Sequence, residues 1–347
     1  MFRIGDITGF PSKKVSGAWV IDHGMNGNPY ALRMTIHYGK EDGVRILLAS
    51  GPEHTSPLAE QAINEISENL NLAELNGVLI SAHDFAPLIS NFKKPGEPLF
   101  PGWPEGDCGE RIAWHIFQDL LSQMDYAIFL EGPEPGITSI PHAAIYTIDN
   151  PPTLSCHPEL IKMMGHDLIL EKKGGKGSLA IEAQREFGLQ VLITQIDEAD
   201  ANSRMLSRTK EKVFNFLSYA GLVQTRAEIP ERTFIAAQTG EVRSDFDGEL
   251  NLDFALYDFL STGQRVGTIL KDKSDKSVII ETEESGYAVR LRKGGHVLVD
   301  DFIYSLLEVN FRSYGSSMLF CNTILDNRDT QNVKFRENKL FKRLNRV

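Results

Sequence analysis

The sequence predicts an α/β fold with a smaller all-β region toward the C-terminus. In the first two-thirds of the chain, short apolar runs alternate with segments that have helical periodicity. After Pro230 the helical periodicity stops, and short segments separated by glycines follow. Strands that alternate with helices favour a mostly parallel or mixed sheet with helices on both faces, which makes three layers.

The elements expected in the α/β region come in strand–helix order. Apolar runs with the length of buried strands lie at residues 44–50, 77–82, 126–130 and 189–196. Apolar residues recur at helical spacing in residues 57–69, 109–124, 178–187 and 203–220. Gly221 follows the last of these segments, at the place where a C-cap glycine is expected.

The chain of 347 residues is long enough for two domains. We expect an α/β domain over residues 1–225, a linker over 226–232, a small β domain over 233–310 and a C-terminal extension over 311–347. The last part of the extension, residues 331–347, carries six Lys or Arg residues and one Glu, with apolar residues near helical spacing. This basic tail is expected to dock on the acidic body of its own chain, or else to contact a partner, a membrane surface or RNA.

Composition argues against several classes of protein. The net charge of −11 argues against a general nucleic-acid binder. No apolar run approaches the ~18 residues needed to span a bilayer, and the N-terminus lacks the apolar stretch of a signal peptide, so a cytoplasmic protein is expected. The three cysteines, Cys108, Cys156 and Cys321, are far apart, so neither a disulfide framework nor a Cys-x-x-Cys metal site is expected.

The segments that follow the predicted strands carry a recognisable order of motifs. Residues 51–57 read Gly-Pro-Glu-His-Thr-Ser-Pro, and residues 97–102 read Glu-Pro-Leu-Phe-Pro-Gly before a helix. The next strands end in Phe-Leu-Glu at residues 129–131 and in Thr-Gln at residues 194–195. Glycine-containing turns in the β region complete the order, at residues 263–269 and 294–299.

This order resembles that of the succinylglutamate desuccinylase/aspartoacylase family, relatives of the zinc carboxypeptidases. The resemblance covers residues 15–310. It implies a three-layer domain like that of the zinc carboxypeptidases, with a mostly parallel or mixed sheet, followed by a small barrel-sandwich-like β domain. It also implies a metal-dependent amidohydrolase, or deacylase, that acts on N-acyl amino acids.

The resemblance further implies where a metal site and its general base belong. In the family, two histidines and a glutamate bind zinc, and a second glutamate activates the metal-bound water. These positions fall here on Glu53, Ser56 and Glu131 for the metal ligands and on Gln195 for the general base. None of the four keeps the family's residue. We expect them to converge at the edge of the sheet where the strands have their carboxyl ends.

The substrate clamp implied by the resemblance has changed as well. The family's Asn-Arg pair, which binds the substrate carboxylate, falls on Glu97 and Pro98, and proline offers no donor. At the metal position, two glutamates and a serine make an oxygen site that suits Mg²⁺, Mn²⁺ or Ca²⁺ better than zinc. Gln195 cannot accept a proton at neutral pH, so it cannot act as a general base.

Substitute ligands are available nearby in the sequence. His54 lies next to Glu53, and His83 ends the neighbouring strand, so a shifted His/Glu metal site with Glu53 and Glu131 is an alternative. In the simpler interpretation, His54 is a loop histidine bonded to backbone and His83 an ordinary residue at a strand end.

Two further motifs are weaker. The run Gly174-Gly175-Lys176-Gly177-Ser178 precedes a helix and could hold an anion, but it lacks P-loop spacing and is better explained as a turn. Cys156 and His157 lack a third orienting group nearby in the sequence, which favours an ordinary loop cysteine.

Two functions of different classes follow. The first is a non-catalytic binding or regulatory relative of the hydrolases that has lost the metal site, needs no cofactor and binds a small acidic ligand like an acyl amino acid. The second is an active deacylase that uses zinc or another divalent metal on the substituted ligands. The same fold supports either function, and the changed residues favour the first.

Overall fold

The structure is a computed structural model that describes residues 1–24, 26–92, 98–149, 151–196, 203–225, 227, 233–272 and 276–308. It divides into two compact units. The first unit comprises Met1–Pro133 and Pro141–Thr233, and the second comprises Glu134–Ile140 with the described residues from Phe234 onward. Glu97, Cys321 and the basic tail 331–347 lie outside the described residues.

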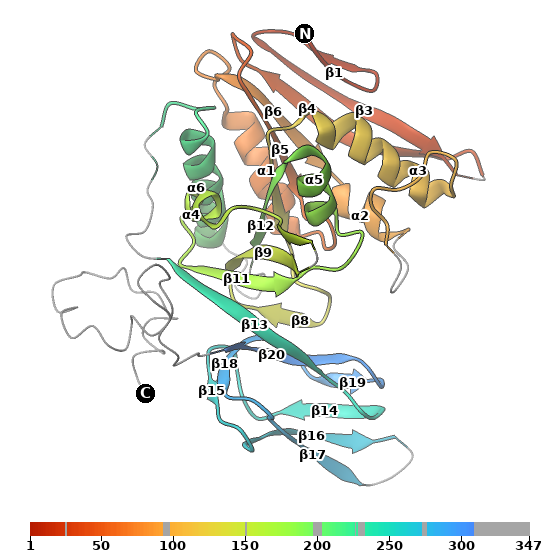
Figure 1. Ribbon diagram of the computed structural model, residues 1–347, viewed down its shortest axis with the longest axis vertical. Coiled ribbons are helices and arrows are strands. Elements are labelled where there is room, and N and C mark those ends of the chain that lie inside the picture. Colours follow the sequence, from red (N-terminus) through yellow and green to blue (C-terminus); the bar gives the residue numbers. More distant parts are fainter. Residues whose placement is uncertain are drawn as a thin grey trace, which may run out of the picture. The chain divides into compact units, whose positions relative to one another are not determined.

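The first unit is built on a mixed sheet (Figure 1) with the strand order β11-β9-β12-β7-β5-β6-β4-β3. The central strands β12, β7, β5 and β6 run parallel to one another. β9 pairs antiparallel with β12 and parallel with β11, and β4 pairs antiparallel with both β6 and β3. The strands are β3 (Lys13–His23), β4 (Pro29–Tyr38), β5 (Val44–Ser50), β6 (Gly77–His83), β7 (Tyr126–Glu131), β9 (His142–Asp149), β11 (Leu168–Lys173) and β12 (Gln190–Gln195). β1 (Phe2–Ile4) and β2 (Ile7–Gly9) form a separate two-stranded antiparallel sheet. β10 (Pro152–Leu154) pairs with β9.

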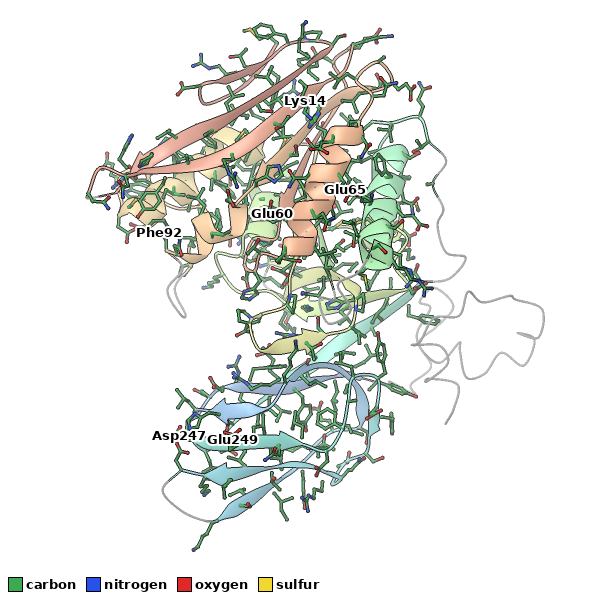
Figure 2. The ribbon with its side chains drawn as sticks, turned by 180° about the vertical axis from the view of Figure 1, so that it is seen from behind. Lys14, Glu60, Glu65, Phe92, Asp247 and Glu249 are labelled. Carbon is green, nitrogen blue, oxygen red and sulfur yellow. The ribbon has the colours of Figure 1, made fainter. Side chains whose placement is uncertain are left out.

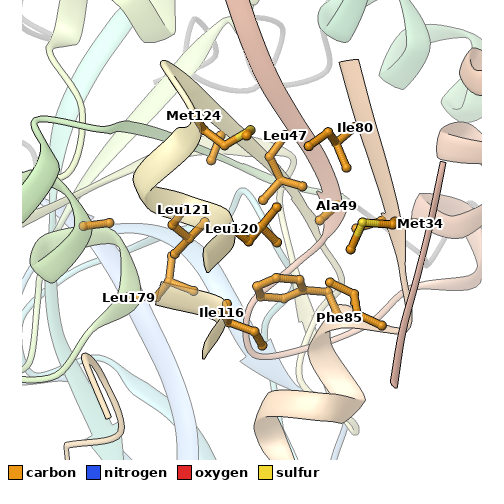
Figure 3. Packing of buried hydrophobic residues seen from close by; sticks show 14 of the residues in the cluster. Met34, Leu47, Ala49, Ile80, Phe85, Ile116, Leu120, Leu121, Met124 and Leu179 are labelled. Atoms are coloured by element: carbon orange, nitrogen blue, oxygen red, sulfur yellow. The ribbon is translucent and has the colours of Figure 1, made fainter. Parts of the chain in front are cut away.

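Helices cover both faces of this sheet, as expected for three layers. One buried cluster joins strand residues such as Leu47 and Ala49 to α2 (Phe85–Ser90), α3 (Cys108–His115) and α5 (Leu179–Phe187), as Figure 3 shows. On the opposite face, α1 (Pro57–Asn69) packs against α6 (Ser203–Tyr219). A short helix, α4 (Pro158–Lys162), precedes β11.

Local sequence signals explain where the longer helices begin and end. Ser56 caps α1 and Pro57 occupies its first turn, where a missing N–H costs nothing. Asp107 and Glu110 form a reciprocal capping box at the start of α3. The predicted helix 109–124 continues from α3 as a π-helical turn, Ile116–Leu120, and a 3-10 turn, Leu121–Gln123. Gly221 follows α6 with φ of 77°, which confirms the predicted glycine at the C-cap.

The second unit consists of strands, with no helix among its described residues. One sheet has the order β15-β18-β20-β13, and β8 pairs with β18; the other has the order β17-β16-β14-β19. The strands are β8 (Ile137–Ser139), β13 (Phe234–Arg243), β14 (Gly248–Leu252), β15 (Phe259–Leu260), β16 (Arg265–Lys271), β17 (Ser277–Glu281), β18 (Gly286–Arg292), β19 (Gly295–Val297) and β20 (Phe302–Glu308). Both sheets contribute to one buried cluster, which includes Leu250, Ile269, Ala288 and Tyr304.

No sequence signal assigns β8 to this unit, because the strand lies in the middle of the α/β region. β8 pairs antiparallel with β18, and Glu134 forms an ion pair with Arg290 at 3.8 Å. The fold class of an α/β domain followed by a β region is confirmed. Within the described residues, no helix is both long and apolar enough to cross a bilayer.

Candidate functional site

The candidate site lies where β5, β7 and β12 have their carboxyl ends. Glu131 and Gln195 are direct neighbours in the parallel pair of β7 and β12. The backbone N–H of Gly51, just past β5, donates to the carbonyl of Leu130 at 2.7 Å. The structure therefore brings the segment after β5 together with Glu131 and Gln195, although these residues are far apart in the sequence.

Two glycines allow these segments to pack closely. A Cβ atom on Gly51 would lie 2.7 Å from Cβ of Glu131 and 2.8 Å from its Cγ, so the Glu131 side chain passes directly over Gly51. A Cβ atom on Gly132 would lie 2.5 Å from the carbonyl oxygen of Thr55 and 2.9 Å from Cβ of Ser56. The N–H of Gly132 also donates to the carbonyl of His54 at 3.1 Å.

Ser56 serves as the N-cap of α1. Its hydroxyl oxygen accepts a hydrogen bond of 3.2 Å from the N–H of Ala59, and the residue is fully buried. A capping serine satisfies one of the free N–H groups at the helix start. The hydroxyl at the position that the resemblance assigns to the family's glutamate ligand therefore has a local structural use.

Gln195 is tied to the backbone of its neighbour. Its side-chain amide donates to the carbonyl of Glu131 at 3.2 Å, and the N–H of Ile196 donates to the same oxygen at 2.8 Å. Glu131 and Gln195 are both buried. Glu53, by contrast, is exposed and His54 is half-buried, so the two glutamates predicted as ligands differ in their exposure to solvent.

A buried histidine at this edge was missed by the sequence analysis. His142 begins β9 and lies directly opposite Gln195 on the far side of β12 from Glu131. Glu131, Gln195 and His142 therefore form one row across three strands, and partners in such a row point to the same face of the sheet. The apolar run after residue 142 signals a strand, but its position beside β12 depends on the tertiary fold.

A second polar group lies one strand further along the same edge, where β6 ends. Nδ1 of His83 and Oε2 of Glu60, on α1, are 2.8 Å apart, and the N–H of Asp84 donates to Oε1 of Glu60 at 3.4 Å. Figure 2 shows Glu60 and Glu65 along α1. Burial raises the pKa of Glu60, but the hydrogen bonds with His83 and with the N–H of Asp84 help to lower it more, so the pKa lies below its ordinary value.

An ion pair flanks this group. Arg33, on β4, is the direct antiparallel partner of His83, and its Nε donates to Oδ2 of Asp84 at 2.6 Å. Asp84 has a left-handed backbone with φ of 59°, an uncommon conformation for a residue other than glycine. The sequence singled out His83 but neither Glu60 nor Arg33, because only the fold brings the three residues together.

The predicted clamp residue Pro98 packs on the glycine run. A Cβ atom on Gly177 would lie 2.3 Å from Cβ of Pro98, and the N–H of Phe100 donates to the carbonyl of Gly177 at 3.3 Å. The N–H of Gly177 donates to Oε1 of Glu182, in α5, at 3.2 Å. The carboxylate of Glu182 thus already accepts from an N–H of the glycine run. This agrees with the interpretation of the glycine run as a turn.

The loop around Cys156 also has a structural explanation. Cys156 is a free, fully buried cysteine, and burial raises the pKa of its thiol to about 12. Nδ1 of His157 accepts a hydrogen bond from the N–H of Glu159 and caps α4. These observations agree with an ordinary loop cysteine.

The positions that the resemblance assigns to zinc hold two glutamates and a serine in this chain. Ser56 is buried as a helix cap, and the amide of Gln195 is bound to backbone. Zinc sites need three or four nitrogen, sulfur or carboxylate ligands in tetrahedral geometry. Within the residues that the structure describes, no group of three or more His, Cys, Asp or Glu side chains is arranged to hold a metal ion.

Comparisons with known proteins agree with this fold. No family model matches the sequence. Over 218 residues the chain is 23% identical to the N-alpha-acetyl-L-2,4-diaminobutyric acid deacetylase of Halomonas elongata. This match covers 60% of the chain and 64% of that relative, so it spans less than two thirds of the relative's length.

Solved structures give a broader match. The succinylglutamate desuccinylase/aspartoacylase from Rhodobacter sphaeroides superposes with a TM-score of 0.73 at 16% identity, covering 91% of this chain and all of that one. The product-bound ectoine utilization protein EutE (DoeB) from Ruegeria pomeroyi gives a TM-score of 0.70 at 16% identity, covering 85% of this chain and 94% of that one. The chain therefore resembles the succinylglutamate desuccinylase/aspartoacylase family and has its fold.

Proposed function

We propose that this chain is a non-catalytic binding or regulatory relative of the amidohydrolases that act on N-acyl amino acids. The fold supplies the deacylase-like framework, and the ligands that it would bind are small acyl-amino-acid-like compounds. The relative from Halomonas elongata, a deacetylase of an acylated diamino acid by its name, supports this class of ligand. The zinc centre and the general base of the hydrolases are replaced.

The observation that carries the proposal is the structural use of Ser56. A neutral hydroxyl is a poor metal ligand, and the buried Ser56 hydroxyl already uses one of its two lone pairs to accept from the N–H of Ala59. At the general-base position, Gln195 bonds to a backbone carbonyl and has no proton-accepting group at neutral pH. Loss of general-base action alone typically lowers a rate by ~10²–10⁴-fold.

Metal analysis and an activity assay on the full chain test this proposal. We expect no stoichiometric zinc after purification and reloading, and no hydrolysis of N-acetylaspartate, succinylglutamate or N-acetyl-2,4-diaminobutyrate above background. Tight zinc binding with turnover by the unmodified chain contradicts the proposal.

A restored variant sharpens the test. It combines Glu53→His, Ser56→Glu, Glu131→His and Gln195→Glu, which returns the family's residues to all four positions. We expect zinc binding by this variant and none by the unmodified chain. A matched control carries the same substitutions at positions 53, 131 and 195 but has Ser56→Ala in place of Ser56→Glu. It should bind zinc more weakly because it lacks one ligand.

An active deacylase with substituted ligands remains the second candidate. One observation favours it: His83 is held at Nδ1 by the carboxylate of Glu60, the arrangement that commonly orients a metal-binding histidine. In that case zinc binding and turnover by the unmodified chain should both be lost in His83→Ala or His54→Ala.

A further inference from the structure

His83 and its neighbour Arg33 each have one side-chain nitrogen that makes no hydrogen bond to a residue that the structure describes. Nδ1 of His83 bonds to Glu60, so Nε2 is the polar atom that the ring still offers. Arg33 contacts Asp84 through Nε and Nη2, and its Nη1 makes no hydrogen bond to any residue that the structure describes. The Arg33 side chain is 66% exposed and open to a ligand, and the His83 side chain is 15% exposed, so solvent reaches part of it.

The carboxylate of Glu60 decides what His83 offers. An ionised carboxylate only accepts hydrogen bonds, so Nδ1 must carry the ring proton that lies between them. In the neutral imidazole, Nε2 then presents a lone pair and accepts a hydrogen bond. Arg33 offers the opposite, because every guanidinium nitrogen is a donor with positive charge.

The acceptor and the donor lie side by side. Arg33 and His83 are direct partners in the antiparallel pair of β4 and β6, so their Cβ atoms are about 5 Å apart on one face of the sheet. A small molecule that reaches both must supply a donor to Nε2 and an anion to the guanidinium. The charged groups that surround His83 are Glu60 from α1, Asp84 from the start of α2, and Arg33 from β4.

We propose that His83 and Arg33 form a two-point binding site for a small amino acid with a free ammonium and a free carboxylate group. The ammonium donates to Nε2 of His83 and is favoured by the nearby carboxylates of Glu60 and Asp84. The ligand carboxylate accepts from Nη1 of Arg33. Strand β5 separates His83, on β6, from Glu131, on β7, and Gln195 lies one strand further along the sheet, on β12. The inference deepens the proposed function by naming the ligand's chemical class and its recognition site.

Calorimetry on the full chain at neutral pH tests the two-point geometry. The probes are L-2,4-diaminobutyrate, succinate, which lacks the ammonium group, and 1,3-diaminopropane, which lacks the carboxylate. We expect L-2,4-diaminobutyrate to bind and the two single-function probes to bind at least tenfold more weakly, because each leaves a charged hydrogen bond unmade. His83→Phe and Arg33→Met should each weaken binding of L-2,4-diaminobutyrate at least tenfold.

His115 offers a matched control, since its Nδ1 lies 2.7 Å from Oδ2 of Asp119 in another carboxylate–imidazole pair. His115→Phe should leave binding unchanged. Because His83→Phe could impair folding, ¹⁵N spectra of the histidine rings in the unmodified chain give a second readout, and L-2,4-diaminobutyrate should shift Nε2 of His83. The site is overturned if L-2,4-diaminobutyrate does not bind at millimolar concentration, if a single-function probe binds equally well, or if that shift is absent. Turnover by the unmodified chain would instead refute the proposed function and leave these binding results unchanged.

Discussion

The side-chain amide of Gln195 donates to the backbone carbonyl of Glu131, its direct neighbour across β12 and β7, at 3.2 Å. A glutamate at position 195 would place a carboxylate oxygen against that carbonyl, and two acceptors repel. We expect Gln195→Glu to destabilise the fold by about 1–3 kcal/mol at neutral pH, the usual cost of a buried polar group without its partner. Urea unfolding at pH 7 measures the change.

The half-exposed Gln190 provides the control for this substitution, because its amide also donates to a backbone carbonyl, that of Gly188. Water can solvate a carboxylate there, so Gln190→Glu should change stability by less than about 0.5 kcal/mol. Equal effects of the two substitutions would mean that the contact of Gln195 with Glu131 is not the cause of the loss of stability.

The N-cap of α1 gives a second prediction. Ser56→Ala removes the hydroxyl that accepts from Ala59 and should lower the free energy of unfolding by about 0.5–2 kcal/mol, whereas Ser56→Asp should keep most of it. Ser178 is the matched control, because it is the N-cap residue of α5 but its side chain makes no capping hydrogen bond. If Ser178→Ala costs as much as Ser56→Ala, the cap of α1 is not the cause.

Stability at low pH should depend on Glu60. The pKa of Glu60 is lowered in the folded chain. Its contribution to the free energy of unfolding is therefore complete above the ordinary pKa of 4.5 and is lost as pH falls through the pKa in the folded chain. In urea unfolding, the stability difference between the unmodified chain and Glu60→Gln should be largest above pH 5 and shrink toward pH 3. A difference that stays constant over this range would show that the carboxylate charge is not responsible.

His37 should set a pH dependence in a higher range. It is fully buried, and burial together with the charge of Lys14 lowers its pKa from 6.5 to about 4. Nε2 of His37 lies 2.8 Å from Oγ of Ser67 and 3.3 Å from Oγ of Ser81, while Nδ1 makes no hydrogen bond to the described residues.

The unfolded chain binds the His37 proton more tightly than the folded chain. The contribution of neutral His37 to the free energy of unfolding is therefore complete above pH 6.5. It is lost, at up to about 1.4 kcal/mol per pH unit, as pH falls toward 4. His37→Gln, which removes the titrating group, should flatten the stability profile between pH 6.5 and 4. A slope unaltered by His37→Gln would contradict the assignment.

The sequence predicted elements whose signals are local. The apolar run of β5 and the helix α1, which begins at Pro57 after its serine cap, have the predicted bounds. The short or half-exposed strands β1 to β4 and β8 to β11 were not assigned, because only their pairing partners distinguish them from loops. The resemblance to the family rests on the order of the motifs along the chain, which is recognisable although the residues at the four site positions differ.

The candidate site was predicted only in part, and the reason is physical. The edge formed by Glu131 and Gln195 follows from the rule that parallel strands gather their carboxyl ends. The use of Ser56 as a cap could be read from Ser-Pro before an apolar helix. Glu60, Arg33 and His142 could not be assigned, because their positions depend on which helix covers which strand and on the order of strands in the sheet.

The position of β8 has a consequence for how the protein is synthesised. Glu134–Ile140 leaves the ribosome well before β18 and β20, the strands that complete its sheet. Until those residues emerge, β8 is a nascent strand with an unpaired edge, and unpaired edges invite wrong pairing. A fragment that begins at residue 233 lacks this strand and the Glu134 partner of Arg290, so truncation there removes part of a sheet of the second unit.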